Sequence, residues 1–203
     1  MNQIPQLQNS DRPMGLLRAR SRIYDEATAL LILQFCFTVL LPVVAAGVAL
    51  LAPPIRPYTA AVALVVSALD VTVLDRMYRA KLKVAAKIAE AFDCEVLTLP
   101  WNTFVAGKHA ETETIVAAQA AWRGDDGKLT NWYPVAVGAA PLHLARIICQ
   151  RTNLWYDAKL RRHYGAWVLV FAAVLLAGLV IAASFTGLTI ALLISTVLPP
   201  APP

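Results

Sequence analysis

Cysteine, glycine, histidine and charged residues are all scarce in this sequence of 203 residues. There are three cysteines, nine glycines and three histidines, and only 15% of the residues are charged. The cysteines, Cys36, Cys94 and Cys149, provide neither a disulfide framework nor the ligand spacing of a zinc site. The sequence also lacks a glycine-rich phosphate loop, a nucleophile elbow and an HExxH motif. We therefore expect no catalytic residues, no enzyme activity, no metal and no cofactor.

Apolar residues, in contrast, make up 58% of the chain, and the mean hydropathy of +0.57 is too high for an ordinary soluble domain. They are concentrated in two blocks, residues 27–74 and 166–198. A proline-rich stretch at 52–57 divides the first block into two arms, each long enough to cross a bilayer. The last arm, residues 188–198, is shorter than the roughly 17 to 25 residues that a span requires. We expect the fourth span to be incomplete or re-entrant.

These blocks predict a mainly α-helical integral membrane protein, in which two pairs of transmembrane helices flank a small helical region with room for one short strand. The expected parts are an N-terminal segment with a short amphipathic helix (1–26), a first transmembrane hairpin (27–75), a soluble region (76–165) and a second hairpin (166–203).

The basic residues predict the orientation. Four arginines precede the first span and thirteen of the eighteen basic residues lie between residues 76 and 165, whereas Arg56 alone lies in the first hairpin turn. Because basic residues next to spans stay in the cytoplasm, the N-terminus and the central region should both be cytoplasmic. The net charge of +5 therefore reflects topology more than binding to a nucleic acid polymer.

Local patterns predict the elements of the central region. Apolar residues spaced by three and four over 78–92 indicate that the second span continues as an amphipathic helix, and 94–99 is a short run that favours a strand. A helix is expected over 111–122, and a long one from Pro141 toward Tyr164 that leads into the third span. The first ten residues are polar, and we expect little order in them.

Two groups of side chains in this region are candidates for ligand binding. His143, Arg146, Gln150, Asn153 and Asp157 recur at spacings of three and four and so share one face of the long helix, with Arg151 on the apolar face. The aromatic residues Trp101, Trp122, Trp132, Tyr133 and Trp155 are numerous for so small a region. Arginines and aromatic faces bind phosphates and bases, but a solvated stripe, a small core or an interfacial belt would explain them as well.

Within the spans, polar residues are few. Asp70 is the one intramembrane carboxylate, Ser67 lies on about the same helical face, and Gln34 and Thr38 form a polar pair on the first span. An intramembrane acid usually faces a bundle interior or a water-filled cavity. Pairing of Asp70 with Arg76 or a nearby lysine is the simpler alternative.

Several stretches resemble one known family. They are Ile4-Pro5-x-Leu7-Gln8-Asn9-Ser10, Phe92-Asp93-Cys94-Glu95-Val96-Leu97 with Leu99-Pro100-Trp101-Asn102, Trp132-Tyr133-Pro134, and Ala145-Arg146-Ile147-Ile148-Cys149-Gln150-Arg151-Thr152-Asn153 with Trp155 and Arg161-Arg162-x-Tyr164. Together they resemble the SMODS-associated four-transmembrane family of pore-forming effectors. The family pattern continues past a complete fourth span, whereas this sequence stops at Pro203, so we expect a C-terminally truncated or naturally short form.

The resemblance implies a membrane effector of CBASS, the cyclic-oligonucleotide-based antiphage defence. It would bind a cyclic oligonucleotide messenger in the cytoplasm and form a homo-oligomer that permeabilises the bacterial inner membrane. The messenger site would then comprise Trp101, Asn102, Trp132, Tyr133, Arg146, Gln150, Arg151 and Asn153, with arginines on phosphates, aromatic rings on bases, and Gln150 and Asn102 reading base edges. A transporter or channel subunit and a membrane-tethered scaffold for a protein partner are the alternatives.

Overall fold

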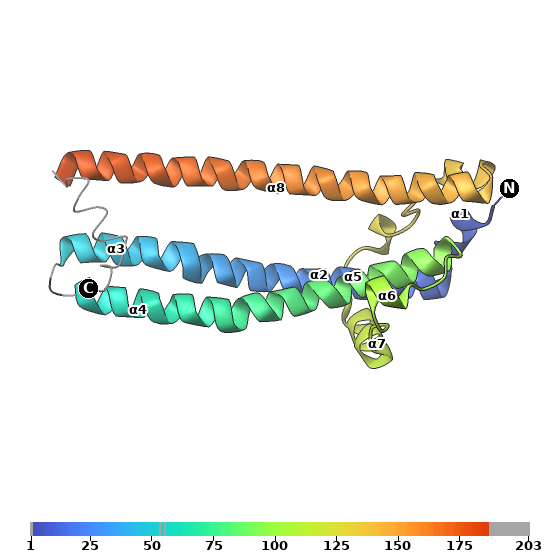
Figure 1. The fold of residues 1–203 in the computed structure, drawn as a ribbon, viewed down its shortest axis with the longest axis horizontal. Coiled ribbons are helices and arrows are strands. Elements are labelled where there is room, and N and C mark those ends of the chain that lie inside the picture. Colours follow the sequence, from blue (N-terminus) through green and yellow to red (C-terminus); the bar gives the residue numbers. More distant parts are fainter. Residues whose placement is uncertain (1, 53, 55, 187–203) are drawn as a thin grey trace. The chain divides into compact units, whose positions relative to one another are not determined.

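A computed structural model describes residues 2–52, 54 and 56–186 of the chain. This part is almost entirely helical and contains no β-strand, which confirms the mainly helical prediction. In chain order the elements are α1 (Ile4–Leu7), α2 (Asp11–Phe35), the π-helical η1 (Cys36–Leu40), α3 (Leu41–Leu51), α4 (Arg56–Leu69), the π-helical η3 (Asp70–Leu74), α5 (Asp75–Val96), α6 (Thr103–Ala106), α7 (Thr112–Ala121), the 3-10 helices η4 (Asp126–Lys128) and η5 (Val135–Ala139), and α8 (Leu142–Thr186) (Figure 1).

The chain forms two compact units, Met1–Ile147 and Ile148–Pro203. The first unit contains α1 to η5 and the first residues of α8, and the second contains the rest of α8. α8 is continuous from Leu142 to Thr186, as the sequence predicts for a helix that leads into the third span. One unbroken helix therefore contributes residues to both compact units.

Two long helical stretches make a hairpin in the first unit. α2, η1 and α3 follow one another from Asp11 to Leu51, and α4, η3 and α5 follow one another from Arg56 to Val96. Figure 1 shows them side by side, in blue and green, and the most extensive packing is between α2 and α5. Buried residues of α5 recur at spacings of three and four, as expected for a helix with one apolar face: Ala85, Ile88, Phe92 and Val96.

A glycine allows α7 to pack closely on α2, and an ion pair of Glu26 connects α2 with α5. A Cβ atom at Gly15 would lie 2.8 Å from Oε1 of Gln119, so this glycine lets α7 approach α2 closely. Glu26 of α2 accepts a hydrogen bond from Nζ of Lys81 on α5 at 2.5 Å and also pairs with Arg22 at 3.2 Å. These contacts fix the part of the hairpin that α2 and α5 form.

The short strand predicted at residues 94–99 is wrong. α5 continues through Val96, which is fully buried, and the N–H of Leu99 donates to the carbonyl of Cys94 at 2.9 Å. Thr98 has a φ of +51°, so the helix ends in a left-handed residue. Val96 lies four residues after Phe92 on the buried face, and this tertiary burial overrides the local preference for a strand.

The expectation of little order in the first ten residues is also wrong. α1 is anchored by Ile4, which is 1% exposed, and by Asn2, whose side-chain amide donates to the carbonyls of Val137 and Ala140 at 2.7 and 2.9 Å. The N–H of Asn2 donates to the carbonyl of Gly138 at 3.1 Å. Bonds to residues far along the chain, and not local propensity, order this segment.

Two helical stretches in the described residues, Asp11–Ala45 and Leu142–Gly178, are long and apolar enough to cross a membrane. The predicted arm at 188–198 lies outside the described residues, so the four-helix membrane arrangement remains a prediction.

In the first hairpin, η1 lies just before Pro42 and η3 begins at Asp70. A proline cannot donate a backbone hydrogen bond, which favours a change of helical pitch in the turn before it.

Candidate functional site

Two side-chain amides of the N-terminal segment clamp the loop that carries Trp132. Gln8 is fully buried; its Nε2 donates to the carbonyl of Tyr133 at 3.1 Å, and its Oε1 accepts from the N–H of Tyr133 at 2.7 Å. Nδ2 of Asn9 donates to Oδ1 of Asn131 at 2.8 Å, and Oδ1 of Asn9 accepts from the N–H of Asn131 at 2.9 Å. The residues on both sides of Trp132 are therefore held by the segment that precedes α2.

Tyr133 is a core residue in this structure. It is fully buried, its ring stacks on that of Phe92 with centroids 6.1 Å apart, and its hydroxyl donates to Oδ1 of Asp93 at 2.5 Å. A base could reach this ring only if the core opened. The geometry therefore favours the core alternative that the sequence left open for Tyr133.

Arg146 closes the C-terminal end of α5. Its Nε donates to the carbonyl of Leu97 at 2.7 Å, and its Nη2 donates to the carbonyl and the hydroxyl of Thr98 at 2.6 and 2.7 Å. The last carbonyls of a helix carry partial negative charge, so a guanidinium there satisfies both their hydrogen bonds and the helix dipole. This arginine has a structural role before any ligand arrives.

Trp132 is the candidate aromatic that faces a cation. The guanidinium carbon of Arg20 lies 4.5 Å from the Trp132 ring centroid and 5.2 Å from that of Tyr24. All three side chains are half-buried. Sequence reasoning missed Arg20, although a tyrosine four residues further along the same helix face is the signal that could have found it.

Trp101 and Asn102 shape the loop around α6. Trp101 stacks on His109 with centroids 3.9 Å apart and donates from Nε1 to the carbonyl of Gly107 at 2.9 Å. The side chain of Asn102 caps α6 by accepting from the N–H groups of Phe104 and Val105. Gly107, at a φ of +72°, occupies a conformation that side-chain-bearing residues rarely adopt. Phe104, 97% exposed, forms the tip of this loop.

The other predicted ligand residues belong to the second unit. Gln150, Arg151 and Asn153 lie on α8 beyond Ile147, whereas Trp101, Asn102, Trp132, Tyr133 and Arg146 lie in the first unit. Asp157 of this helix pairs with Arg161 at 2.8 Å, and no ion pair joins it to Arg151 in the described part of the chain.

Arg18 and Asp126 form the main ion pair between α2 and the loop after α7. Nε of Arg18 donates to both carboxylate oxygens of Asp126, at 3.0 and 3.2 Å, and Nη2 donates to Oδ2 at 2.7 Å. The indole N–H of Trp122 donates to Oδ1 at 3.2 Å. These bonds, chiefly that with Arg18, lower the pKa of Asp126 and raise the pKa of Arg18.

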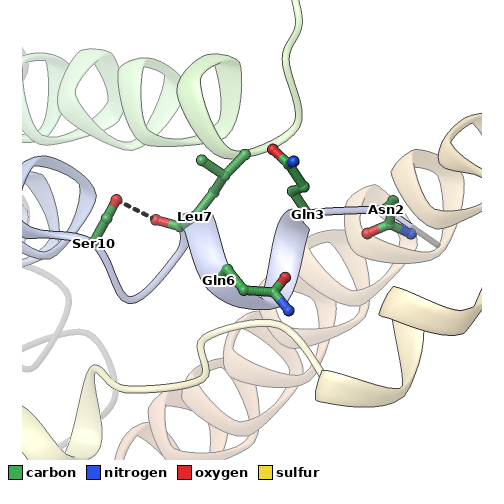
Figure 2. A pocket seen from close by; sticks show the side chains of 5 residues that line it. All are labelled: Asn2, Gln3, Gln6, Leu7 and Ser10. Carbon is green, nitrogen blue, oxygen red and sulfur yellow. Dashed lines mark hydrogen bonds between the residues drawn. The ribbon is translucent and has the colours of Figure 1, made fainter.

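Two open hollows flank α1. One, of about 570 Å³, is lined by Asn2, Gln3, Gln6, Leu7 and Ser10, and Figure 2 shows its amide side chains around the short helix. The other, of about 330 Å³, lies between α1, Val96, Thr98 and the start of α8. Each lining offers amides and one hydroxyl, that of Ser10 or of Thr98, but no charged side chain, so neither hollow provides a counter-charge for a phosphate.

The polar residues of the predicted spans lie at or near the two π-helical turns. Oδ1 of Asp70 is buried and has no hydrogen-bond partner among the described residues, and Gln34 is half-buried. The hydroxyl of Thr38 bonds to the carbonyl of Gln34 at 2.8 Å, within its own helix, and Ser67 is exposed. No ion pair joins Asp70 to Arg76 in the described part; the nearest ion pair along the chain is that of Asp75 with Arg79 at 2.7 Å.

In the described residues, no three His, Cys, Asp or Glu side chains come together as metal ligands. What the first unit offers is a compact helical fold with one aromatic-framed arginine, joined to helices long and apolar enough for a bilayer. This arrangement is that of a mainly helical protein with two stretches that are long and apolar enough to cross a membrane.

Comparison with known proteins gives the family. The model of the SMODS-associating 4TM effector domain matches residues 2–203, and the chain belongs to this family. A protein of Bacillus cereus (strain VD146) named a probable CBASS effector molecule is 24% identical over 169 residues, which cover 81% of this chain and 56% of that protein. The chain thus spans little more than half the length of this relative. No solved structure matches the chain. The family indicates a role in antiphage defence at a membrane.

Proposed function

We propose that this protein is a non-enzymatic CBASS effector that binds a cyclic oligonucleotide through its cytoplasmic region, assembles as a homo-oligomer and permeabilises the bacterial inner membrane. The observation that carries the proposal is that both apolar helical stretches, Asp11–Ala45 and Leu142–Gly178, begin inside the compact soluble fold. A ligand that rearranges this fold moves the ends of membrane helices directly. Binding drives the change only if the messenger has higher affinity for the open or assembled state.

Not every residue of the predicted site can contact the messenger in the fold as it stands. Tyr133 is buried and Arg146 caps α5, so their proposed role is to hold the site and not to touch the ligand. Trp132 and Trp101 are half-buried and offer ring faces for stacking, and Asn102 is exposed beside Trp101. On α8, the proposed contacts are Gln150, Arg151 and Asn153, with the guanidinium of Arg151 toward a phosphate.

We place the permeation path at the polar residues of the first hairpin: Asp70, Ser67, Gln34 and Thr38. Asp70 is the most informative of them, because a buried carboxylate oxygen without a hydrogen bond is costly in an apolar setting. Hydration of this position in the open state would remove that cost. Several copies are required, since one hairpin cannot enclose a column of water.

The test uses the purified full chain in liposomes loaded with a self-quenched dye, to which a panel of cyclic di- and trinucleotides is added. One nucleotide should release the dye and shift the crosslinked protein from monomer to oligomer. The Asp70→Asn variant should bind this nucleotide equally well but conduct cations less selectively, which reversal potentials under a potassium chloride gradient would measure. If no nucleotide causes leakage from liposomes that contain folded protein, the proposal fails.

A membrane-tethered scaffold is the second candidate, because Phe104 and Val105 are 97% and 79% exposed at the α6 tip. If the protein is a scaffold, replacement of both residues by serine would abolish its activity in cells. If it is an effector, the same replacement would leave nucleotide-induced leakage intact. The same two assays therefore separate the candidates.

A further inference from the structure

Arg20 stands apart from the other arginines of α2 because no carboxylate neutralises it. Arg12 pairs with Glu95 at 3.2 Å, Arg18 with Asp126 at 2.7 Å and Arg22 with Glu26 at 3.2 Å. Arg20 makes no ion pair with any described residue, and its Nε is buried without a hydrogen-bond partner. Nε of Arg22 also lacks a hydrogen bond, but it lies 3.2 Å from Oε1 of Glu26, so Arg20 alone among the arginines of α2 has no carboxylate partner in the described residues.

Aromatic rings fix the position of this guanidinium. It lies 4.5 Å from the Trp132 centroid and 5.2 Å from the Tyr24 centroid, within the range of cation–π attraction. Stacking restricts the rotamers of a long side chain and so lowers the entropy that ligand binding must remove. An arginine held in this way is prepared for an anion in its plane.

The clamp on the 131–133 loop places Trp132 above Arg20. Gln8 holds the backbone of Tyr133 and Asn9 holds Asn131, whose φ of +55° turns the chain at this point. The residues before α2 therefore act as positioning residues for a ring that lies next to an arginine of α2. A surface arginine that is only solvated by water does not require an aromatic ring held beside it in this way.

The chemistry selects a phosphodiester. A guanidinium donates two parallel hydrogen bonds to adjacent oxygens of a phosphate, and an indole beside it offers a face to a base. Arg20 lies on the cytoplasmic side of the predicted first span, where nucleotides and lipid headgroups are both present. The two sources share the phosphodiester, but only a nucleotide adds a base for the Trp132 ring.

We propose that Arg20, framed by Trp132 and Tyr24, is a phosphodiester-binding site and that its ligand is the phosphate of the nucleotide messenger; the second part rests on the proposed function. Arg20 is then a direct contact, and Gln8 and Asn9 act through Trp132.

The experiment measures binding to the full chain in maltoside micelles, which contain no phosphate, by calorimetry and thermal shift. The probes are sodium pyrophosphate, a panel of cyclic di- and trinucleotides, and phosphatidylglycerol. Arg20→Gln is compared with Arg12→Gln, which removes the same charge from the same helix at a side chain that is 84% exposed. Arg20→Lys keeps the charge and removes the planar fork.

We expect pyrophosphate and one cyclic nucleotide to bind the wild type, about tenfold or more weaker to Arg20→Gln, and nearly unchanged to Arg12→Gln. Arg20→Lys should also bind the nucleotide more weakly than the wild type, although the substitution leaves the charge unchanged. Displacement of pyrophosphate by phosphatidylglycerol but by no nucleotide would keep the phosphodiester site and assign it to lipid.

The outcomes separate the two proposals. Pyrophosphate binding that depends on Arg20, with no cyclic nucleotide bound, would support the site and contradict the messenger function. Nucleotide binding that is equal in Arg20→Gln and wild type would overturn the site and leave the function in place. Unchanged binding of every probe, together with a lower melting temperature for Arg20→Gln, would show that Arg20 is only a structural staple.

Discussion

Single side chains carry much of the long-range structure of this protein. Gln8, Asn9, Asp93 and Arg146 each bond to a residue that is 40 or more positions away along the chain. All four lie in the stretches on which the family resemblance rests. The resemblance therefore has a physical basis, because these stretches meet one another in the fold and are not merely similar strings of letters.

Gln8 is the most exacting of these residues. Replacement of Gln8 by alanine leaves the N–H and the carbonyl of Tyr133 buried without partners, and we expect the free energy of unfolding to fall by about 1–3 kcal/mol. Urea denaturation of the protein, followed by tryptophan fluorescence, measures this loss. Gln6→Ala is the matched control, because Gln6 is an exposed glutamine of α1, two residues before Gln8. Equal stability of the two variants would contradict the clamp.

Asp126 predicts a pH dependence. Its hydrogen bonds, first with Arg18, lower its pKa in the folded protein, so the ion pair stabilises the fold above the unfolded-state pKa of about 3.9. This contribution is lost as the pH falls from about 4 through the lowered folded-state pKa. We expect the wild type to exceed Asp126→Asn in melting temperature by a constant margin above about pH 5, and the margin to shrink below about pH 4. A margin that stays constant down to the acid limit of folding would exclude a contribution from this ionisation.

At the scale of elements, the end of α5 depends on a residue of another helix. Arg146, on the first turns of α8, binds the carbonyls of Leu97 and Thr98, and the N–H of Leu99 closes the turn onto Cys94. The start of the long membrane-directed helix is thereby attached to the end of the helix that continues the first hairpin. This contact lies wholly in the first unit, which ends at Ile147.

Replacement of Arg146 by alanine should therefore destabilise the fold before it affects any ligand. We expect a loss of about 1–2 kcal/mol, because three hydrogen bonds from a charged group, one to buried Leu97 and two to exposed Thr98, disappear. Hydrogen exchange should accelerate at residues 97–99 more than at α7. If exchange there were unchanged while nucleotide affinity fell, Arg146 would be a ligand contact and not a helix cap.

At the scale of the whole molecule, hydropathy and periodicity predict what is local. The long helices, α7 near residues 111–122, and the continuity of α8 follow from residue spacing and from apolar blocks. The order of residues 2–10 does not follow from local patterns, because Gln8 bonds to a residue 125 positions further along the chain. The strand at 94–99 was wrong because Val96 follows the register of Phe92, which only packing reveals. Trp132 was predicted as a ligand contact. Arg20 was not, because membrane topology already accounts for all four arginines that precede the first span.

The topology also belongs to this scale, and exposed residues of the first unit can report it. In a chain with Cys36, Cys94 and Cys149 replaced by alanine, we would introduce Phe104→Cys at the α6 tip or Pro54→Cys at the hairpin turn; both positions are exposed. The basic residues flanking the spans predict that residue 104 is cytoplasmic, and a single crossing on each side of residue 54 would place that residue outside. An impermeant maleimide should thus label Pro54→Cys in intact spheroplasts and Phe104→Cys only in inverted vesicles.

Labelling of both from one side would mean that the first hairpin lies along the membrane instead of crossing it. Messenger binding could not then act by moving the ends of two transmembrane helices, and the effector would have to disturb the bilayer from its surface.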